Sequence, residues 1–251
     1  MMLDSIISET RKRVDRLPVS FPKNPRDTHA SLSRAIRSAR GKNAVIAELK
    51  CASPTRGTIR SDVDLASMAK TFVSAGCVAL SVLTEPHFFA GSVRDIPLVK
   101  DVVGVPVLRK DFIIDRRQIA ETRALGADAV LLITAVLGGR LPGFVDDAFD
   151  EGLEPLVEVH THADVEIAQS TRADIIGINN RDLSTLAVDL STTRVLSPLV
   201  RSAGRIVVCE SGIASAGDVR DLRPFCDAYL IGTSIMAHDT PEKKLEEFVC
   251  A

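Results

Sequence analysis

Residues 105–114 read VPVLRKDFII, an apolar run that ends in three consecutive charged residues and then becomes apolar again. The Val and Leu side chains of such a run require burial on both faces of a strand. Lysine is rarely buried without a partner, so we expect Lys110 to stand at the end of this strand, facing a cavity. A competing interpretation is that Arg109, Lys110 and Asp111 form a solvated strand exit. The ends of the other strands decide between the two.

A short apolar run, a turn and a longer segment of helical periodicity recur along the chain from residue 44 onward. The eight apolar runs, which we expect to be strands, are residues 44–50, 78–83, 105–110, 127–133, 154–158, 174–179, 206–210 and 227–232. The eight segments after them, which we expect to be helices, are residues 62–75, 92–102, 115–125, 139–151, 162–170, 190–199, 215–222 and 241–249. This alternation is typical of βα units in a parallel sheet.

Eight βα units predict an α/β fold in the form of a closed (β/α)8 TIM barrel, for which about 250 residues is typical. An open doubly wound sheet is the alternative, but that fold usually has a glycine-rich phosphate loop after its first strand. Here the first run leads into KCASPTRG at residues 50–57, which contains one glycine. No linker or change in composition divides the chain. We therefore expect residues 1–251 to form a single barrel domain, with residues 1–43 as an N-terminal helical extension.

Composition excludes several classes of partner. The formal net charge of -2 provides no basic surface for nucleic acid, and the longest predominantly apolar stretch, around residues 127–137, is too short to span a membrane. The five cysteines lie far apart without a metal-site spacing, so we expect reduced thiols and a cytoplasmic protein. His87, His160 and His162 show no paired-ligand spacing, so no metal is expected. We expect His160 to support its neighbours or to cap a strand end.

Polar residues recur at the last inward-facing position of the predicted strands. In the first strand the apolar residues at every second position suit the helix layer, which places Glu48 and Lys50 on the inner face. The same alternation gives the inner ends of four later strands as Lys110, Glu158, Asn179 and Glu210. The C-terminal mouth of a barrel carries its chemistry, and two lysines among three glutamates can shift one another's pKa values toward proton transfer. A structural ring of ion pairs is the alternative.

Two turns rich in Gly and Ser follow the last two predicted strands. The first contains Ser211 and Gly212, and the second contains Gly232, Thr233 and Ser234. Barrels often bind phosphate at these two places, through backbone N–H groups and the N-terminus of a short extra helix. Residues 233–237 could form that helix. The expected ligand is therefore a small phosphorylated molecule.

Eight motifs occur in order over nearly the whole chain: AELKCASPTRG, LSVLTEPHFFAGS, PVLRKDFIID, GADAVLLI, EPLVEVH, GINNRDL, CESGI and LIGTSIM. With these motifs the chain closely resembles the indole-3-glycerol phosphate synthase family. The resemblance implies conversion of 1-(2-carboxyphenylamino)-1-deoxyribulose 5-phosphate to indole-3-glycerol phosphate, carbon dioxide and water in tryptophan biosynthesis, without a metal or an organic cofactor. It leaves open whether the chain associates with other enzymes of that pathway.

The resemblance also implies roles for the residues at the barrel mouth. Lys110 would be the general acid of ring closure, and Phe112 would pack against the aromatic ring of the substrate. Lys50 and Glu158 would be the acid and the base that remove water. Glu48, two residues from Lys50 on the same face, would hold the Lys50 ammonium in place.

The same resemblance gives Glu210 and Asn179 contacts with the lysines or with the ribulose hydroxyls. Ser53 and Arg181 would bind the carboxylate end of the substrate, since an arginine two residues beyond a strand end can meet an anion. The predicted phosphate contacts are Ser211, Gly212, Gly232, Thr233 and Ser234.

The chain departs from the family pattern in its first loop, where Cys51 replaces a basic residue and Thr55 with Arg56 replaces a Ser and Lys pair. These changes bear on the contacts of the loop and not on the reaction. Two other functions compete with the synthase. A sugar-phosphate isomerase would usually need a Cys or Asp acid and base pair, and a non-catalytic ligand-binding barrel would have lost the charges at the mouth.

Overall fold

The protein, seen here in a computed structural model, is described over residues 2–22, 30–61 and 63–251. Eight parallel strands close into a barrel in the order β1-β10-β9-β8-β7-β6-β5-β4. Their bounds are β1 (Ala44–Leu49), β4 (Ala79–Leu83), β5 (Val107–Lys110), β6 (Ala129–Ile133), β7 (Glu154–Val159), β8 (Ile175–Asn179), β9 (Ile206–Glu210) and β10 (Ala228–Ile231). Closure confirms the predicted TIM barrel and excludes the open sheet. Every observed strand end lies within two residues of its predicted position.

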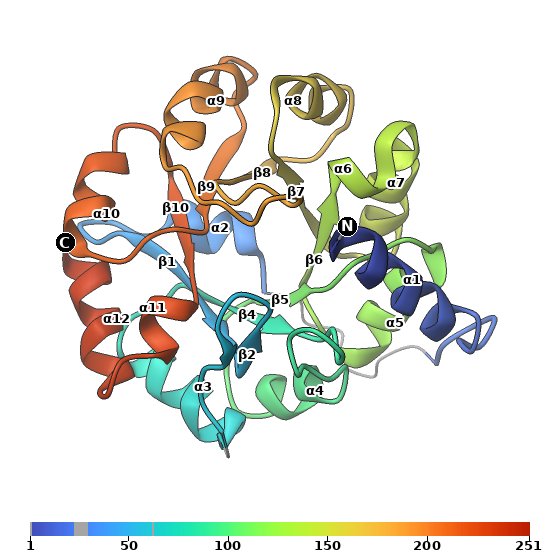
Figure 1. The fold of residues 1–251 in the computed structure, drawn as a ribbon, viewed down its shortest axis with the longest axis horizontal. Helices are drawn as coiled ribbons and strands as arrows, with labels where there is room; N and C mark the ends of the chain where they lie inside the picture. Colours follow the sequence, from blue (N-terminus) through green and yellow to red (C-terminus); the bar gives the residue numbers. More distant parts are fainter. Residues whose placement is uncertain (1, 23–29, 62) are drawn as a thin grey trace.

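Helices form a ring around the strands (Figure 1). They follow the strands as predicted: α3 (Leu65–Ser74), α4 (Asp95–Lys100), α5 (Arg116–Leu125), α7 (Leu141–Asp150), α8 (His162–Gln169), α9 (Ser191–Ser202), α10 (Ala216–Leu222) and α12 (Pro241–Cys250). The start predicted for the first of them, residue 62, lies outside the described residues. The observed start follows Asp64, whose carboxylate accepts hydrogen bonds from the amides of Ala66 and Ser67. Within the described ranges no helix is long and apolar enough to cross a membrane.

Several short elements differ from the sequence prediction. The first loop folds into an antiparallel pair of β2 (Ala52–Ser53) and β3 (Gly57–Thr58), and α6 (Thr134–Leu137) continues into a 3₁₀ turn over Gly138–Arg140. Two-residue strands carry too few side chains to show a period of two, so no sequence pattern predicts them. The predicted short helix after the last strand is present as α11 (Thr233–Met236).

The strands separate two apolar cores. Val45 and every second residue after it in β1 face outward and pack in the helix layer, whereas Ile46 faces the barrel axis. α2 (Leu32–Arg37) closes the N-terminal end of the barrel, because Leu32 and Ile36 pack against the inward residues of the strands. Figure 1 shows α2 behind the strands and α1 (Met2–Val14) on the viewer's side.

A buried ion-pair cluster joins α1 to the barrel wall. Arg109 is wholly buried, and its Nη2 lies 2.8 Å from a carboxylate oxygen of Asp111 and 2.8 Å from one of Glu121 on α5. Arg13 of α1 reaches the same two oxygens at 3.4 and 3.1 Å. The solvated strand exit is therefore wrong for Arg109 and Asp111. Successive side chains of a strand point to opposite faces, so Arg109 points outward beneath α5, whereas the next residue, Lys110, faces the barrel mouth.

Replacing Arg109 by Met should lower the free energy of unfolding by about 3–5 kcal/mol, because the two carboxylates then lose a buried cation. Arg201→Met is the matched control, since the Arg201–Asp227 pair is 40% and 38% exposed and 3.0 Å long and should contribute about 1 kcal/mol or less. Urea denaturation of the three proteins measures the difference. Equal losses in the two variants would show that the cluster adds nothing beyond a surface pair.

Candidate active site

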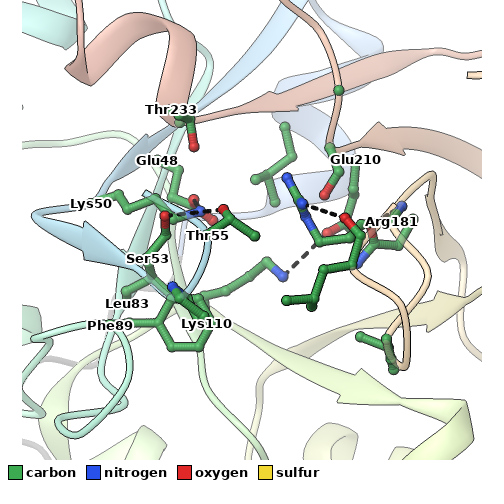
Figure 2. A pocket seen from close by; sticks show the side chains of 18 of the residues that line it. Glu48, Lys50, Ser53, Thr55, Leu83, Phe89, Lys110, Arg181, Glu210 and Thr233 are labelled. Carbon is green, nitrogen blue, oxygen red and sulfur yellow. Dashed lines mark hydrogen bonds and ion pairs between the residues drawn. The ribbon is translucent and has the colours of Figure 1, made fainter. Parts of the chain in front are cut away.

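A cavity of about 270 Å³ opens at the C-terminal end of the barrel. The fourteen site residues predicted from the sequence all line it: Glu48, Lys50, Ser53, Lys110, Phe112, Glu158, Asn179, Arg181, Glu210, Ser211, Gly212, Gly232, Thr233 and Ser234. Figure 2 shows Glu48 and Lys50 on one side of the cavity, and Glu210 and Arg181 on the other. Residues from all parts of the chain therefore meet here because the parallel strands all end at one mouth.

The Lys110 ammonium lies between two carboxylates from other strands. Its Nζ is 3.2 Å from Glu158 Oε2, at the end of β7, and 3.3 Å from Glu210 Oε2, at the end of β9. Burial works against the ammonium, but the charges of Glu158, Glu210 and Glu48 outweigh it and hold the pKa of Lys110 above its ordinary range. Lys110 is therefore a charged proton donor held at a fixed position.

Glu158 and Glu210 differ in protonation although both are buried. Burial raises the pKa of Glu210; the Lys110 ammonium opposes this and the Glu158 carboxylate adds to it, which leaves the pKa at about 8. Burial also favours neutral Glu158, but Lys110, His160 and a hydrogen bond from Asn179 together lower the pKa of Glu158. At neutral pH the pair therefore shares one proton, and burial favours Glu210 as its site.

A second lysine, Lys50, lies on the side of the cavity opposite Glu210 (Figure 2). Lys50 Nζ lies 2.9 Å from Glu48 Oε1 and 5.8 Å from the ring centroid of Phe89. The Phe89 ring lies in turn 6.3 Å from that of Phe112, tilted by 35°. The two rings form an aromatic wall beside Lys50, a surface on which an apolar ring can pack.

Glycines leave the room that two of the carboxylates occupy. A Cβ added at Gly177, the register partner of Glu158 on β8, would come within 2.0 Å of Glu210 Oε1. One added at Gly232 would come within 2.5 Å of Glu48 Oε1. Both contacts are too short for any side chain, so glycine is required at each position for the carboxylate beside it.

Two arginines and the β2–β3 hairpin also line the cavity. The β2–β3 hairpin carries Ser53, whose Oγ accepts the amide of Arg56 at 3.3 Å. Arg181 is anchored by its Nη1, which donates to the Leu186 carbonyl at 2.8 Å. Burial lowers the pKa of Arg181, Glu48 opposes this, and the charge of Arg56 adds to it. Two neighbouring guanidinium groups are suited to binding an anion.

The two turns predicted to bind phosphate lie together at another part of the cavity. Ser211 and Gly212 have positive φ angles of 65° and 89°, a conformation that can turn successive backbone N–H groups toward one point. Ser234 Oγ donates to the carbonyl of Ile213 at 2.7 Å, which ties the turn after β10 to the turn after β9. A single anion can therefore contact both turns.

Comparison with known proteins decides the family. A sequence profile described as indole-3-glycerol phosphate synthase matches residues 3–248. The indole-3-glycerol phosphate synthase of Caldanaerobacter subterraneus is 50% identical over 212 residues, which cover 84% of this chain and 81% of the relative. That of Geobacillus kaustophilus is 42% identical over 247 residues, 96% of this chain and 94% of the relative. The chain belongs to the indole-3-glycerol phosphate synthase family. This membership favours the synthase over the isomerase and the non-catalytic barrel.

Two solved structures of tryptophan synthase alpha chains from Legionella pneumophila are similar in fold. Their TM-scores are 0.61 and 0.62, their sequence identities are 11% and 12%, and the match covers 85% and 86% of this chain and 93% and 94% of theirs. At such low identity the likeness shows the barrel alone. In the described part of this synthase-family chain, no group of three or more His, Cys, Asp or Glu side chains is arranged to hold a metal ion.

Sequence reasoning missed the apolar part of this synthase-family site. Leu131 and Ile133 point inward from β6 into the cavity, and their period of two could have identified them. Met2, Leu3 and Ile6 of α1 also line the cavity. No local sequence pattern predicts that contact, because it joins the start of the chain to strand ends far along the sequence.

Gly177→Ala should displace the Glu210 carboxylate and should lower the turnover of the synthase reaction by about tenfold or more, with a loss of stability of about 1–3 kcal/mol from overpacking. Gly104→Ala is the control, because a Cβ added there has open space around it. Steady-state kinetics and urea denaturation of both variants test this. Wild-type turnover in Gly177→Ala would mean that the exact place of Glu210 is unimportant.

The pH dependence of stability tests the proton on Glu210. Its pKa is about 8 in the folded protein against an ordinary 4.5, so between these pH values the folded state holds a proton that the unfolded chain lacks. The free energy of unfolding, compared with that of Glu210→Gln, should therefore fall as pH rises through this window. Urea titrations across the window measure it. Parallel curves for the two proteins would show that Glu210 is already ionised at neutral pH.

Proposed function

We propose that this chain catalyses the indole-3-glycerol phosphate synthase reaction, a carboxy-lyase step of tryptophan biosynthesis. The substrate would be 1-(2-carboxyphenylamino)-1-deoxyribulose 5-phosphate, and the products indole-3-glycerol phosphate, carbon dioxide and water. The observation that carries the proposal is the Lys110 ammonium, held within 3.3 Å of two carboxylates in a cavity that has anion-binding groups at two separate places. The substrate is likewise an anion at two ends, with reactive atoms between them.

Ring closure requires a proton at the ketone oxygen as the carboxyl-bearing ring carbon attacks the carbonyl carbon. Lys110 supplies that proton as general acid, which turns the ketone oxygen into a hydroxyl while the new carbon–carbon bond forms. Glu210, neutral at pH 7 and 3.3 Å away, can return a proton to the Lys110 amine. Loss of carbon dioxide then leaves its bonding electron pair in the ring and restores aromaticity.

Dehydration completes the reaction and needs an acid and a base. Lys50, paired with Glu48, protonates the departing hydroxyl group. Glu158 removes a proton from the carbon next to the one that carried this hydroxyl group, and the carbon–carbon double bond of the new five-membered ring forms. Glu158 suits the base because its lowered pKa keeps it ionised. Lys50 and Lys110 enter the cavity from different strands, which gives each of the two protonations its own donor.

Substrate binding follows the two anionic ends. Ser53 and Arg181 would bind the carboxylate, and Phe112 would pack against the aromatic ring. The phosphate would lie between the two Gly and Ser turns, in contact with Ser211, Gly212, Gly232, Thr233 and Ser234. We place the enzyme in the cytoplasm, since all five cysteines are free thiols.

The experiment is a fluorescence assay of indole product with wild type and Lys110→Ala. Wild type should form product, and the variant should lose about 10²–10⁴-fold in kcat with little change in KM, because a general acid acts in the transition state. The chain has no Trp and one Tyr, so its own emission interferes little. Lys70→Ala, an exposed residue of α3, is the control, and circular dichroism checks folding. A wild type that binds the substrate without forming indole would refute the proposal.

A further inference from the structure

His160 is a neighbour of Glu158 that the proposed reaction leaves unused. It directly follows β7, two residues beyond Glu158, and it is absent from the lining of the cavity. Its Nε2 lies 3.3 Å from Glu158 Oε1, whereas Lys110 Nζ lies 3.2 Å from the other oxygen, Oε2. The imidazole therefore stands behind the carboxylate, on the side turned away from Lys110.

Neither ring nitrogen of His160 has another polar partner in the described part of the chain. The side chain is 11% exposed, and neither nitrogen makes a hydrogen bond of ordinary geometry there. A buried donor without a partner is unfavourable, and the Glu158 carboxylate is an acceptor 3.3 Å from Nε2. A small rotation of either side chain would turn the 3.3 Å contact into a hydrogen bond.

The backbone that carries His160 is held firmly. Its amide donates to Asp164 Oδ2 at 3.0 Å, and the amide of Thr161 donates to the same oxygen at 3.0 Å. Thr161 and Asp164 form the capping box that begins α8. The imidazole is thus attached to a rigid point between a strand end and a helix start, as a group that orients another requires.

We propose that His160 is a positioning residue for Glu158, whose Nε2–H group holds Oε1 so that Oε2 faces Lys110 and the substrate. This inference rests on the proposed function, in which Glu158 is the base of dehydration. An orienting group behind a catalytic base is a general device of acid–base catalysis. The other groups that act on the Glu158 carboxylate are Lys110 from β5, Asn179 from β8 and Glu210 from β9. Of these, Lys110 contacts Oε2, the oxygen opposite the one that His160 faces.

Three substitutions test the role in the synthase assay. His160→Met keeps volume and removes the N–H donor, and kcat should fall about tenfold to hundredfold, a part of the 10²–10⁴-fold that an acid or base contributes, with KM changed less than about threefold. His160→Gln restores an N–H near the same place and should recover most of kcat. His162→Met, on an exposed side chain of α8, should match wild type. Equal losses in His160→Gln and His160→Met, or none in His160→Met, would overturn the proposal.

A measurement without substrate separates this inference from the proposed function. The Glu158 carboxyl carbon, labelled with ¹³C and assigned through Glu158→Gln, should titrate at higher pH in His160→Met than in wild type, and near the wild-type pH in His160→Gln. An unchanged titration in His160→Met would overturn the positioning role even if the enzyme is active. If wild type forms no indole while the titration shifts as expected, the proposed function fails and the His160–Glu158 contact stands.

Discussion

The structure of this site depends on one ammonium group enclosed by carboxylates. Lys110 can be buried at the barrel mouth only because Glu158 and Glu210 reach its Nζ from two other strands, within 3.3 Å. These strands are not neighbours, because β6 lies between β5 and β7 and β8 lies between β7 and β9. The three charges therefore meet only when the sheet curves into the barrel. Closure therefore assembles the charges and buries most of their surface, and in such an environment electrostatic interactions are stronger than in bulk water.

The barrel mouth has one more carboxylate than it has lysine ammonium groups. Lys50 and Lys110 face three glutamates, and the third carboxylate, Glu210, keeps a proton because burial beside Glu158 makes a second negative charge costly. A site with a charged lysine, an ionised glutamate and a neutral glutamate in contact can donate and accept protons at the same pH. This is the property that a sequence of ring closure and dehydration requires.

Adjacent residues of β5 face two different environments. Arg109 turns outward into an ion-pair cluster that ties α1 and α5 to the barrel wall, and Lys110 turns inward to the cavity. The alternation of a strand places the two side chains on opposite faces although they are neighbours in sequence. At the other end of the barrel, α2 fills the interior with apolar side chains, so the N-terminal face contributes packing and the C-terminal face carries the reactive groups.

The sequence by itself determined the barrel, the strand ends and the residues that meet at the mouth. Eight short apolar runs, each followed by a helical segment, specify parallel strands, and parallel strands bring their C-terminal residues to one place. Tertiary structure alone decided the partners of Arg109, because its partner Glu121 also binds Arg13, which is 108 residues from Glu121 in the sequence. It also decided which glutamate holds the proton and that α1 reaches the cavity, because both depend on distances between side chains that no local pattern encodes.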